Sequence, residues 1–176
     1  EGAMDKGVSI SPEGTVYPLP KGDDYEIELA RVEKLVYEAK GKGQEIVVVM
    51  GVGFVGAVMA AIVADTVDKK TGQPSKFVIG MQRPSERSFW KIPLLNRGIS
   101  PVKAEDPEVD PMISRCVLDK KTLMATYSYD VLKLADVVVA VGQCDSVKED
   151  LGRAGSGHTD RAALEASLGA TAEQMQ

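Results

Sequence analysis

A stretch of nineteen residues without a charged or polar side chain, 46–64, constrains the fold of this chain more than any other feature. Its length would suffice for a membrane-spanning helix. However, Gly51, Gly53 and Gly56 divide it into a run rich in β-branched residues and a run rich in alanine. We therefore interpret the stretch as a buried strand, a glycine turn and a buried helix, and we expect no membrane partner.

Strand-like and helix-like segments alternate along the chain. Prolines and glycines without periodicity predict an irregular arm over residues 5–23. Apolar spacing and turn residues predict strands at 46–50, 77–81, 123–126 and 137–141, and helices at 25–40, 55–67, about 89–91, 112–116, 131–134 and 160–175. This alternation predicts an α/β fold, a Rossmann-like doubly wound parallel sheet with helices on both faces.

The glycine turn carries the pattern GxGxxG as Gly51-Val52-Gly53-Phe54-Val55-Gly56, between a predicted strand and a predicted helix. In this context Gly51 makes the tight turn, Gly53 lets a pyrophosphate approach the backbone, and Gly56 lets the helix lie close to the strand. The free N–H groups and the dipole at the start of the helix then bind the phosphates. The alternative is a glycine-rich turn that serves packing only.

Further candidate residues follow the other predicted strands. Gln82 stands where NAD enzymes of this type carry an acid for the ribose hydroxyls, and a glutamine does not repel a 2′-phosphate. Arg83 follows directly and Arg87 lies about one helical turn on, so NADP is an alternative to NAD. At the end of the fourth strand we expect the cofactor crevice to be lined by Val141, Gly142 and Gln143.

Two segments follow from this reading. Residues 1–43 form the irregular arm and a leading helix, and residues 44–176 form the dinucleotide-binding domain. The chain ends after a predicted helix, where a doubly wound sheet requires another parallel strand, so we expect the domain to be truncated at its carboxyl end.

Composition excludes several classes of function. The formal net charge of -5 provides no overall field that would attract a nucleic acid, and we expect no nucleic-acid partner. Two cysteines are typical of a reducing compartment and predict a cytoplasmic protein. His158 is the single histidine and has no clustered cysteines around it, so we expect no metal site. No pair of carboxylates stands out as an acid and a base, Cys116 is interpreted as buried packing, and no catalytic residue is assigned.

Several motifs in order resemble the amino-terminal domain of nucleotide-sugar dehydrogenases, the UDP-glucose and GDP-mannose dehydrogenase family. They are the glycine turn, the segment 96–102 with the acids Glu105 and Asp106, and the runs 123–126 and 135–141. By this resemblance Gly51, Gly53 and Gly56 match the pyrophosphate turn, Gln82 the ribose acid, and Arg87 a basic residue near the adenosine. Gln82 departs from the family's acid, and Gln143-Cys144 stand where Thr-Pro is usual.

The resemblance implies an activity for the whole enzyme. Members of the family bind NAD and oxidise the primary alcohol of a nucleotide sugar to a carboxylate in two hydride transfers, with a cysteine-bound intermediate. Their catalytic cysteine, lysine and asparagine belong to segments beyond Gln176, so this chain alone is expected to be inactive. A nucleotide-sugar partner and a homo-oligomer are compatible with the resemblance. The alternatives are a non-catalytic module that senses NAD or a nucleotide, and a methyltransferase, which Gln82 disfavours.

Overall fold

A four-stranded parallel sheet lies at the centre of the computed structural model, which describes residues 7–141, 146–148 and 157–159. The strand order is β5-β4-β3-β6. The strands are β3 (Glu45–Met50), β4 (Lys76–Met81), β5 (Leu123–Thr126) and β6 (Val137–Ala140). All four were predicted to within one residue at each end, and the predicted parallel α/β sheet is confirmed.

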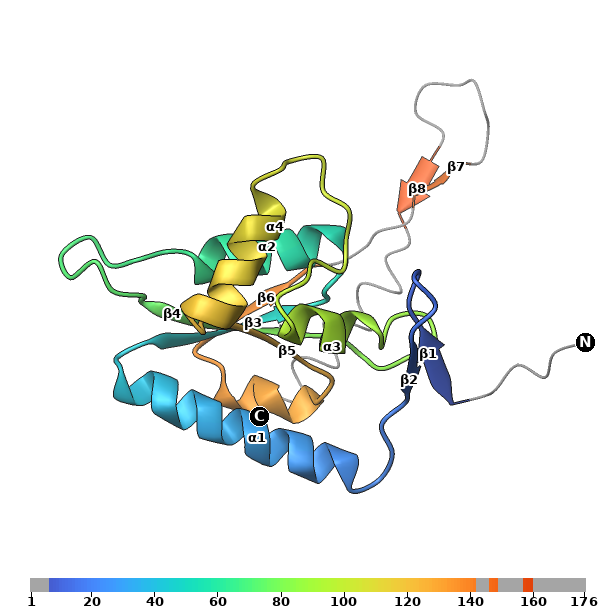
Figure 1. Ribbon diagram of the computed structural model, residues 1–176, viewed down its shortest axis with the longest axis horizontal. Helices are drawn as coiled ribbons and strands as arrows, with labels where there is room; N and C mark the ends of the chain where they lie inside the picture. Colours follow the sequence, from blue (N-terminus) through green and yellow to red (C-terminus); the bar gives the residue numbers. More distant parts are fainter. Residues whose placement is uncertain (1–6, 142–145, 149–156, 160–176) are drawn as a thin grey trace, which may run out of the picture.

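Helices cover both faces of this sheet, as a doubly wound fold requires (Figure 1). One face carries α1 (Asp24–Gly41) and the 3-10 helix η2 (Tyr129–Leu134). The other face carries α2 (Phe54–Ala64), α3 (Lys91–Asn96), α4 (Val109–Ser114) and the π-helical turn η1 (Arg115–Asp119). Because α1 shares a core with the strands, the leading helix packs on the same sheet as the segments that follow it.

The inner strands β3 and β4 are apolar after their first residue, because each of their faces meets a helical layer. Successive side chains of a strand point to opposite faces. In β3, accordingly, Ile46, Val48 and Met50 join the core on the α1 side, whereas Val47 and Val49 join the core on the α2 side. This inner strand of the sheet therefore contributes to both hydrophobic cores.

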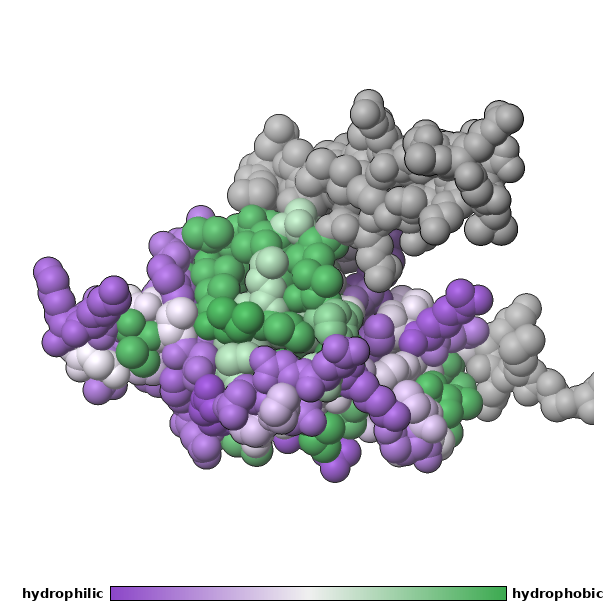
Figure 2. Space-filling model, turned by 90° about the horizontal axis from the view of Figure 1, so that it is seen from above, coloured by the Kyte–Doolittle hydropathy of each residue, from purple (hydrophilic) through white to green (hydrophobic). Residues whose placement is uncertain are grey.

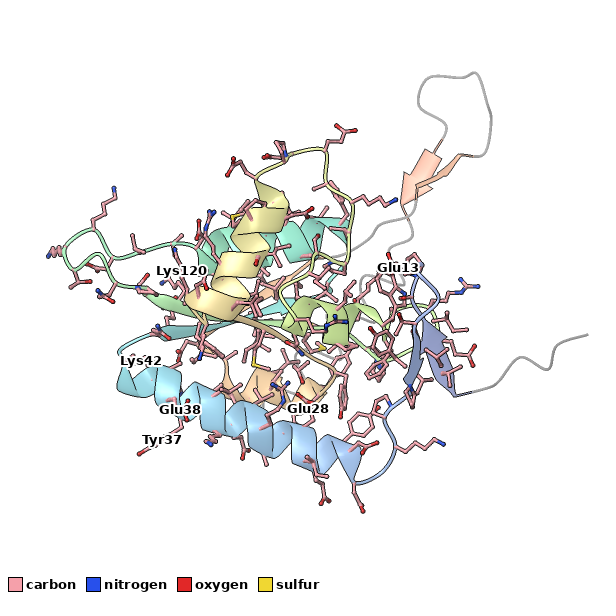
Figure 3. The ribbon with its side chains drawn as sticks, in the orientation of Figure 1. Glu13, Glu28, Tyr37, Glu38, Lys42 and Lys120 are labelled. Atoms are coloured by element: carbon pink, nitrogen blue, oxygen red, sulfur yellow. The ribbon has the colours of Figure 1, made fainter. Side chains whose placement is uncertain are left out.

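The leading helix α1 is amphipathic. Val32, Val36 and Ala39 are buried against the sheet, whereas Tyr37 is 82% exposed and points away from it (Figure 3). Near its start, Glu28 accepts a hydrogen bond from the Thr126 hydroxyl at 3.2 Å, which links the helix to the end of β5.

The helix after the glycine turn packs against the sheet through small side chains. The residues that α2 buries completely are Ala57, Ala60, Ala61 and Ala64. On its outer side Phe54, Val55 and Ile62 are each more than half exposed, and Figure 2 shows apolar residues gathered on the side of the molecule that carries this helix. Among the described residues, no helix combines the length and the apolar character needed to cross a membrane.

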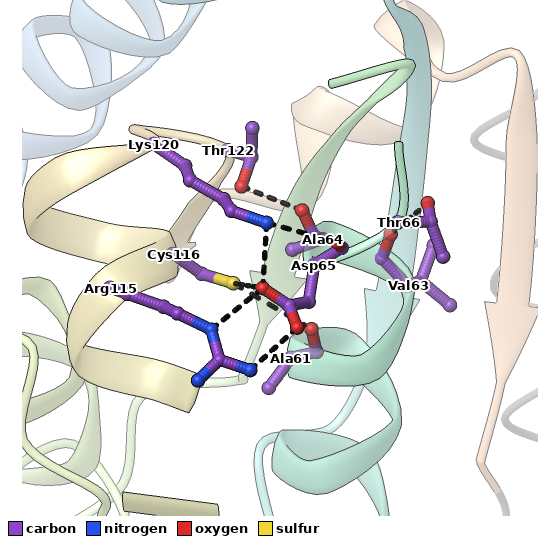
Figure 4. A network of polar contacts seen from close by, with 9 residues as sticks. All are labelled: Ala61, Val63, Ala64, Asp65, Thr66, Arg115, Cys116, Lys120 and Thr122. Atoms are coloured by element: carbon purple, nitrogen blue, oxygen red, sulfur yellow. Dashed lines mark hydrogen bonds and ion pairs between the residues drawn. The ribbon is translucent and has the colours of Figure 1, made fainter. Parts of the chain in front are cut away.

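A network of polar contacts closes the carboxyl end of α2 (Figure 4). Asp65 places a carboxylate at the negative end of the helix dipole, which is unfavourable without a neighbouring cation. Arg115 donates two hydrogen bonds to this carboxylate, at 2.9 and 2.7 Å, and the Lys120 ammonium lies 2.8 Å from it. These cations hold the pKa of Asp65 well below its usual value, with the Arg115 hydrogen bond as the largest cause. The hydroxyl of Thr122 donates to the Ala64 carbonyl at 2.8 Å, so a terminal acceptor of the helix is also satisfied.

Cys116 is fully buried beside this network. Burial raises the pKa of its thiol to about 11, and the nearby Asp65 carboxylate adds to the effect. A thiol with so high a pKa is a poor nucleophile at neutral pH. The interpretation of Cys116 as a packing residue is therefore confirmed.

The amino-terminal arm is not irregular, so the expectation for residues 5–23 was wrong in part. Strands β1 (Val8–Ile10) and β2 (Val16–Pro18) form an antiparallel hairpin with Glu13 near its tip (Figure 3). The turn is held locally, because the Ser11 hydroxyl accepts the Thr15 N–H at 3.1 Å and Gly14 adopts a φ of 88°. The strands are too short for their alternating pattern to stand out between prolines.

A buried serine fixes this hairpin to the rest of the molecule. Ser9 is fully buried, and its hydroxyl donates to the Glu86 carbonyl at 2.8 Å and accepts the Trp90 N–H at 3.1 Å. The hairpin therefore supports the segment between β4 and α3, which borders the site described below.

Other boundaries also differ from the predicted ones. The helix predicted over 55–67 ends at Ala64, because Thr66 folds back onto the Val63 carbonyl and Val67 pairs with Pro74. The helix expected near 89–91 begins only at Lys91, and residues 86–90 before it form turns. A second short hairpin of β7 (Ser146–Lys148) and β8 (Gly157–Thr159) was not predicted. The helix predicted over 160–175 lies outside the described residues.

Candidate functional site

The strand order defines one edge of the sheet as the place for a ligand. From β3 the chain runs outward through β4 to β5, and η2 then returns it to β6 on the other side of β3 (Figure 1). In open α/β sheets ligands bind at such a reversal, outside the carboxyl ends of the strands. Here the reversal lies between β3 and β6, and the glycine turn follows β3 directly.

Two glycines give this turn its shape. Gly51 has a φ of 99°, which side-chain-bearing residues rarely adopt, and its N–H donates to the Met81 carbonyl at 2.7 Å. A Cβ atom on Gly56 would lie 1.9 Å from the Gly51 carbonyl oxygen. The turn therefore requires glycine at both positions, one for the bend and one for the close approach of α2 to the strand.

Neither the bend nor the close approach of α2 requires a glycine at Gly53. It precedes α2 with a φ of -70°, and a Cβ atom there would meet nothing within 4 Å. No side chain caps the helix, and the N–H of Ala57 donates to the Gly53 carbonyl at 2.9 Å. The N–H groups of residues 53–56 thus belong to the first turn of the helix, where intrahelical acceptors are lacking. Open space next to such donors suits an anion.

A cavity of about 410 Å³ lies in front of these donors. No acidic residue is among the described residues that line it, and the first turn of α2 contains no acid either. The lining consists of Gly51, Gly53, Phe54, Val55, Gly56, Gln82, Ser88, Lys91 and Val141. Seven of these were sequence candidates, and the structure brings them together.

Ser88 and Lys91 were not candidates from the sequence. Both lie after β4, far along the chain from the glycine turn. Only topology could have indicated them, because a helix that follows a parallel strand begins near the carboxyl edge of the sheet. Lys91 is the first residue of such a helix, α3.

Val52 and Gln82 support the turn. The carboxamide oxygen of Gln82 accepts the Val52 N–H at 3.1 Å. The Val52 side chain is fully buried and faces Gly80, where a Cβ atom would lie 2.7 Å from it. Val52 therefore contributes its side chain to the core, and its N–H, like that of Gly51, already has a hydrogen-bond acceptor within the protein.

Two neighbouring cavities extend the crevice along the sheet edge. One, of about 160 Å³, shares Gly51, Gln82 and Val141 with the first and adds Arg83 and Tyr129. The guanidinium of Arg83 lies 5.3 Å from the centre of the Tyr129 ring, within cation–π distance. A further cavity of about 460 Å³ is lined by Tyr25, Arg83, Pro84, Tyr127, Ser128, Tyr129 and Asp130.

Tyr127 holds the aromatic part of this edge together. Its ring packs edge-on against Tyr25, with centroids 5.2 Å apart, and against Phe89 at 5.7 Å. The hydroxyl donates to the Asp24 carbonyl at 3.0 Å, and burial raises the pKa of Tyr127 to about 12. Tyr127 therefore stays protonated at neutral pH and serves as a hydrogen-bond donor to α1.

The remaining candidates lie elsewhere. Arg87 is not among the described residues that line these cavities, and it lies in a turn rather than one helical turn beyond Arg83, so the expected helical spacing was wrong. Its carbonyl accepts the indole N–H of Trp90 at 2.8 Å. Gly142 and Gln143 lie outside the described residues.

The geometry has counterparts among solved structures. An NDP-N-acetyl-D-galactosaminuronic acid dehydrogenase from Methanosarcina mazei matches 82% of this chain with a TM-score of 0.61 and 28% sequence identity. The chain resembles the nucleotide-sugar dehydrogenases. A UDP-glucose dehydrogenase from the hyperthermophilic archaeon Pyrobaculum islandicum matches 74% of the chain with a TM-score of 0.53 and 20% identity, which bears on the fold alone. The resemblance predicted from the sequence motifs is thus confirmed.

The match covers only part of each relative. The chain spans 28% of the length of the Methanosarcina protein and 26% of that of the Pyrobaculum protein. No protein-family model and no curated protein sequence matches the chain.

Proposed function

We propose that this chain is the NAD-binding domain of a nucleotide-sugar dehydrogenase, which oxidises the primary alcohol of a UDP- or GDP-sugar to a carboxylate. When bound, NAD accepts the hydride that leaves the sugar carbon. The residues of this chain hold the cofactor, and the residues that act on the sugar belong to other parts of the enzyme. A cytoplasmic location and a homo-oligomeric enzyme belong to the same proposal.

The single observation that carries the proposal is the fit of the glycine turn to a diphosphate. Gly53 leaves open space in front of the first turn of α2, and the cavity there lacks an acid among its described lining residues. Amide N–H groups and the helix dipole attract negative charge at this end of a helix. The likeness in fold to two dehydrogenases supports a dinucleotide over other anions.

Gln82 makes the choice between NAD and NADP testable. It follows the last residue of β4 and lines the cavities of about 410 and 160 Å³, and its carboxamide carries no charge to repel a 2′-phosphate. Arg83 lies next to it and would attract such a phosphate. We propose NAD as the cofactor, with NADPH tolerated.

Fluorescence titration tests this proposal. The chain contains one tryptophan, Trp90, which lies next to Lys91 of the cavity lining. Excitation of Trp90 during titration with NADH, NADPH and AMP should give energy transfer to the two reduced dinucleotides. Binding of AMP alone would favour the alternative, a module that senses a mononucleotide.

A substitution at Gly53 provides the decisive variant. Gly53→Asp places a carboxylate in open space at the start of α2, where aspartate is a favoured cap and the helix dipole stabilises it by about 0.3–1 kcal/mol. The Tm of the variant should thus be no lower than that of the unmodified chain. Its Kd for NADH should nevertheless be at least about tenfold higher, because the added charge repels the diphosphate. Unchanged NADH affinity in a folded Gly53→Asp variant would refute the proposed site.

A further inference from the structure

We infer that Lys91 binds the diphosphate together with the backbone amides of the glycine turn, so that this site selects two linked phosphates over one. The inference rests on the proposed function, because it names a further binding residue of the same site. It adds a charged side chain to a site that the sequence motif describes by backbone N–H groups alone.

Lys91 reaches the cavity from a different element than the amides do. It is the first residue of α3 and lines the same cavity of about 410 Å³ as Gly53 and Gly56, which belong to the start of α2. Ser88, one turn earlier in the chain, lines this cavity too, and its hydroxyl donates to the Arg83 carbonyl at 3.2 Å. The segment that carries Lys91 is fixed to the hairpin of β1 and β2, since the hydroxyl of the buried Ser9 accepts the Trp90 N–H.

The charge of Lys91 is not neutralised within the described part of the chain. No acidic residue described there forms an ion pair with it, and none lines the cavity. Its ammonium lies 5.8 Å from the centre of the Trp90 ring, a contact that leaves its hydrogen-bond donors available. By contrast, Lys120 and Lys76 each have a carboxylate within 2.8 Å.

Two sources of positive potential in one cavity match a diphosphate better than a single phosphate. The start of a helix contributes roughly half an elementary charge and N–H donors in fixed directions. A lysine contributes a full charge at the end of a flexible stem, so it can follow a second phosphate beside the first. A single phosphate on the amides would gain less from Lys91, because the two groups belong to different helices.

Titration of four proteins with two simple anions tests the inference. The unmodified chain, Lys91→Gln, Lys91→Arg and the control Lys69→Gln are each titrated with inorganic pyrophosphate and with orthophosphate, followed by Trp90 emission, and with NADH. Lys69 is exposed in the loop after α2, so its substitution removes the same charge away from the cavity. Thermal unfolding of each variant shows that the comparison is made between folded proteins.

In Lys91→Gln we expect the Kd for pyrophosphate and the Kd for NADH to rise about tenfold. The Kd for orthophosphate, which carries a single phosphate, should rise about threefold or less. Lys91→Arg should restore most of the affinity, and Lys69→Gln should behave as the unmodified chain. Equal affinities of the unmodified chain and folded Lys91→Gln for pyrophosphate and NADH would overturn the inference but leave the proposed function standing. If the unmodified chain bound neither NADH nor pyrophosphate, both would fall.

Discussion

Gly56→Ala should destabilise the fold more than any other single added methyl group in the glycine turn. The new Cβ atom would lie 1.9 Å from the Gly51 carbonyl oxygen, whereas ordinary contacts begin near 3.4 Å. Either the turn or α2 must therefore move by about 1.5 Å. Because α2 packs through fully buried alanines, it cannot withdraw without opening space against the sheet. Overpacking of this kind costs about 3 kcal/mol, which corresponds to a fall of roughly 6–12 °C in Tm for a chain of this size.

Urea unfolding followed by far-UV circular dichroism measures this cost. Gly53→Ser is the matched control, because it adds a side chain three residues earlier, where a Cβ atom meets nothing within 4 Å and serine is a favoured helix cap. The control should change the free energy of unfolding by less than about 1 kcal/mol. If Gly56→Ala were as stable as Gly53→Ser, the close approach of α2 to the end of β3 would be refuted.

Three further predictions concern polar contacts at the end of α2, at the cofactor crevice and at the amino-terminal hairpin. Because its cationic partners lower the pKa of Asp65 in the folded state, its contribution to stability is full above the ordinary carboxyl pKa of about 3.9 and is lost as the pH falls below it. Asp65→Asn should therefore cost about 2 kcal/mol at pH 7 and flatten the acid limb of a Tm-against-pH curve, and an unchanged limb would contradict this. Gln82→Glu keeps an acceptor for the Val52 N–H but adds a charge, so the ratio of NADPH to NADH Kd values should rise about tenfold, and a constant ratio would show that position 82 does not face the ribose. Ser9→Ala removes two hydrogen bonds that fix the hairpin, so amide exchange of β1 and β2 should accelerate about tenfold or more, whereas unchanged exchange would mean that the hairpin is held by other contacts.

The parallel sheet could be predicted from the sequence because the apolar pattern of each strand lies within a few consecutive residues. A strand covered on both faces has apolar residues on both of them, and the buried runs Val47–Val49 and Phe77–Ile79 show this pattern directly. The glycine turn could also be predicted, since the positive φ at Gly51 and the close approach of Gly56 to the Gly51 carbonyl each exclude a side chain.

What the sequence did not show depends on contacts between distant segments. The hairpin of β1 and β2 is fixed by Ser9, whose partners lie more than seventy residues away. Lys91 lines the cavity because β4 ends beside β3, and no pattern around it differs from that of a surface lysine. Gln82 could be predicted as a site residue from its position after a strand. Its hydrogen bond with the Val52 N–H could not, because that bond depends on the ends of β3 and β4 lying side by side.

The backbone amides of the glycine turn allow the most direct measurement. In ¹⁵N–¹H spectra recorded during titration with NAD, the resonances of Gly53, Phe54, Val55 and Gly56 should show the largest shifts, because their N–H groups would donate to the diphosphate. The Val52 resonance should move less, since its N–H already donates to Gln82. Saturable NAD binding that leaves the amides of residues 53–56 unshifted would contradict a diphosphate site at the start of α2.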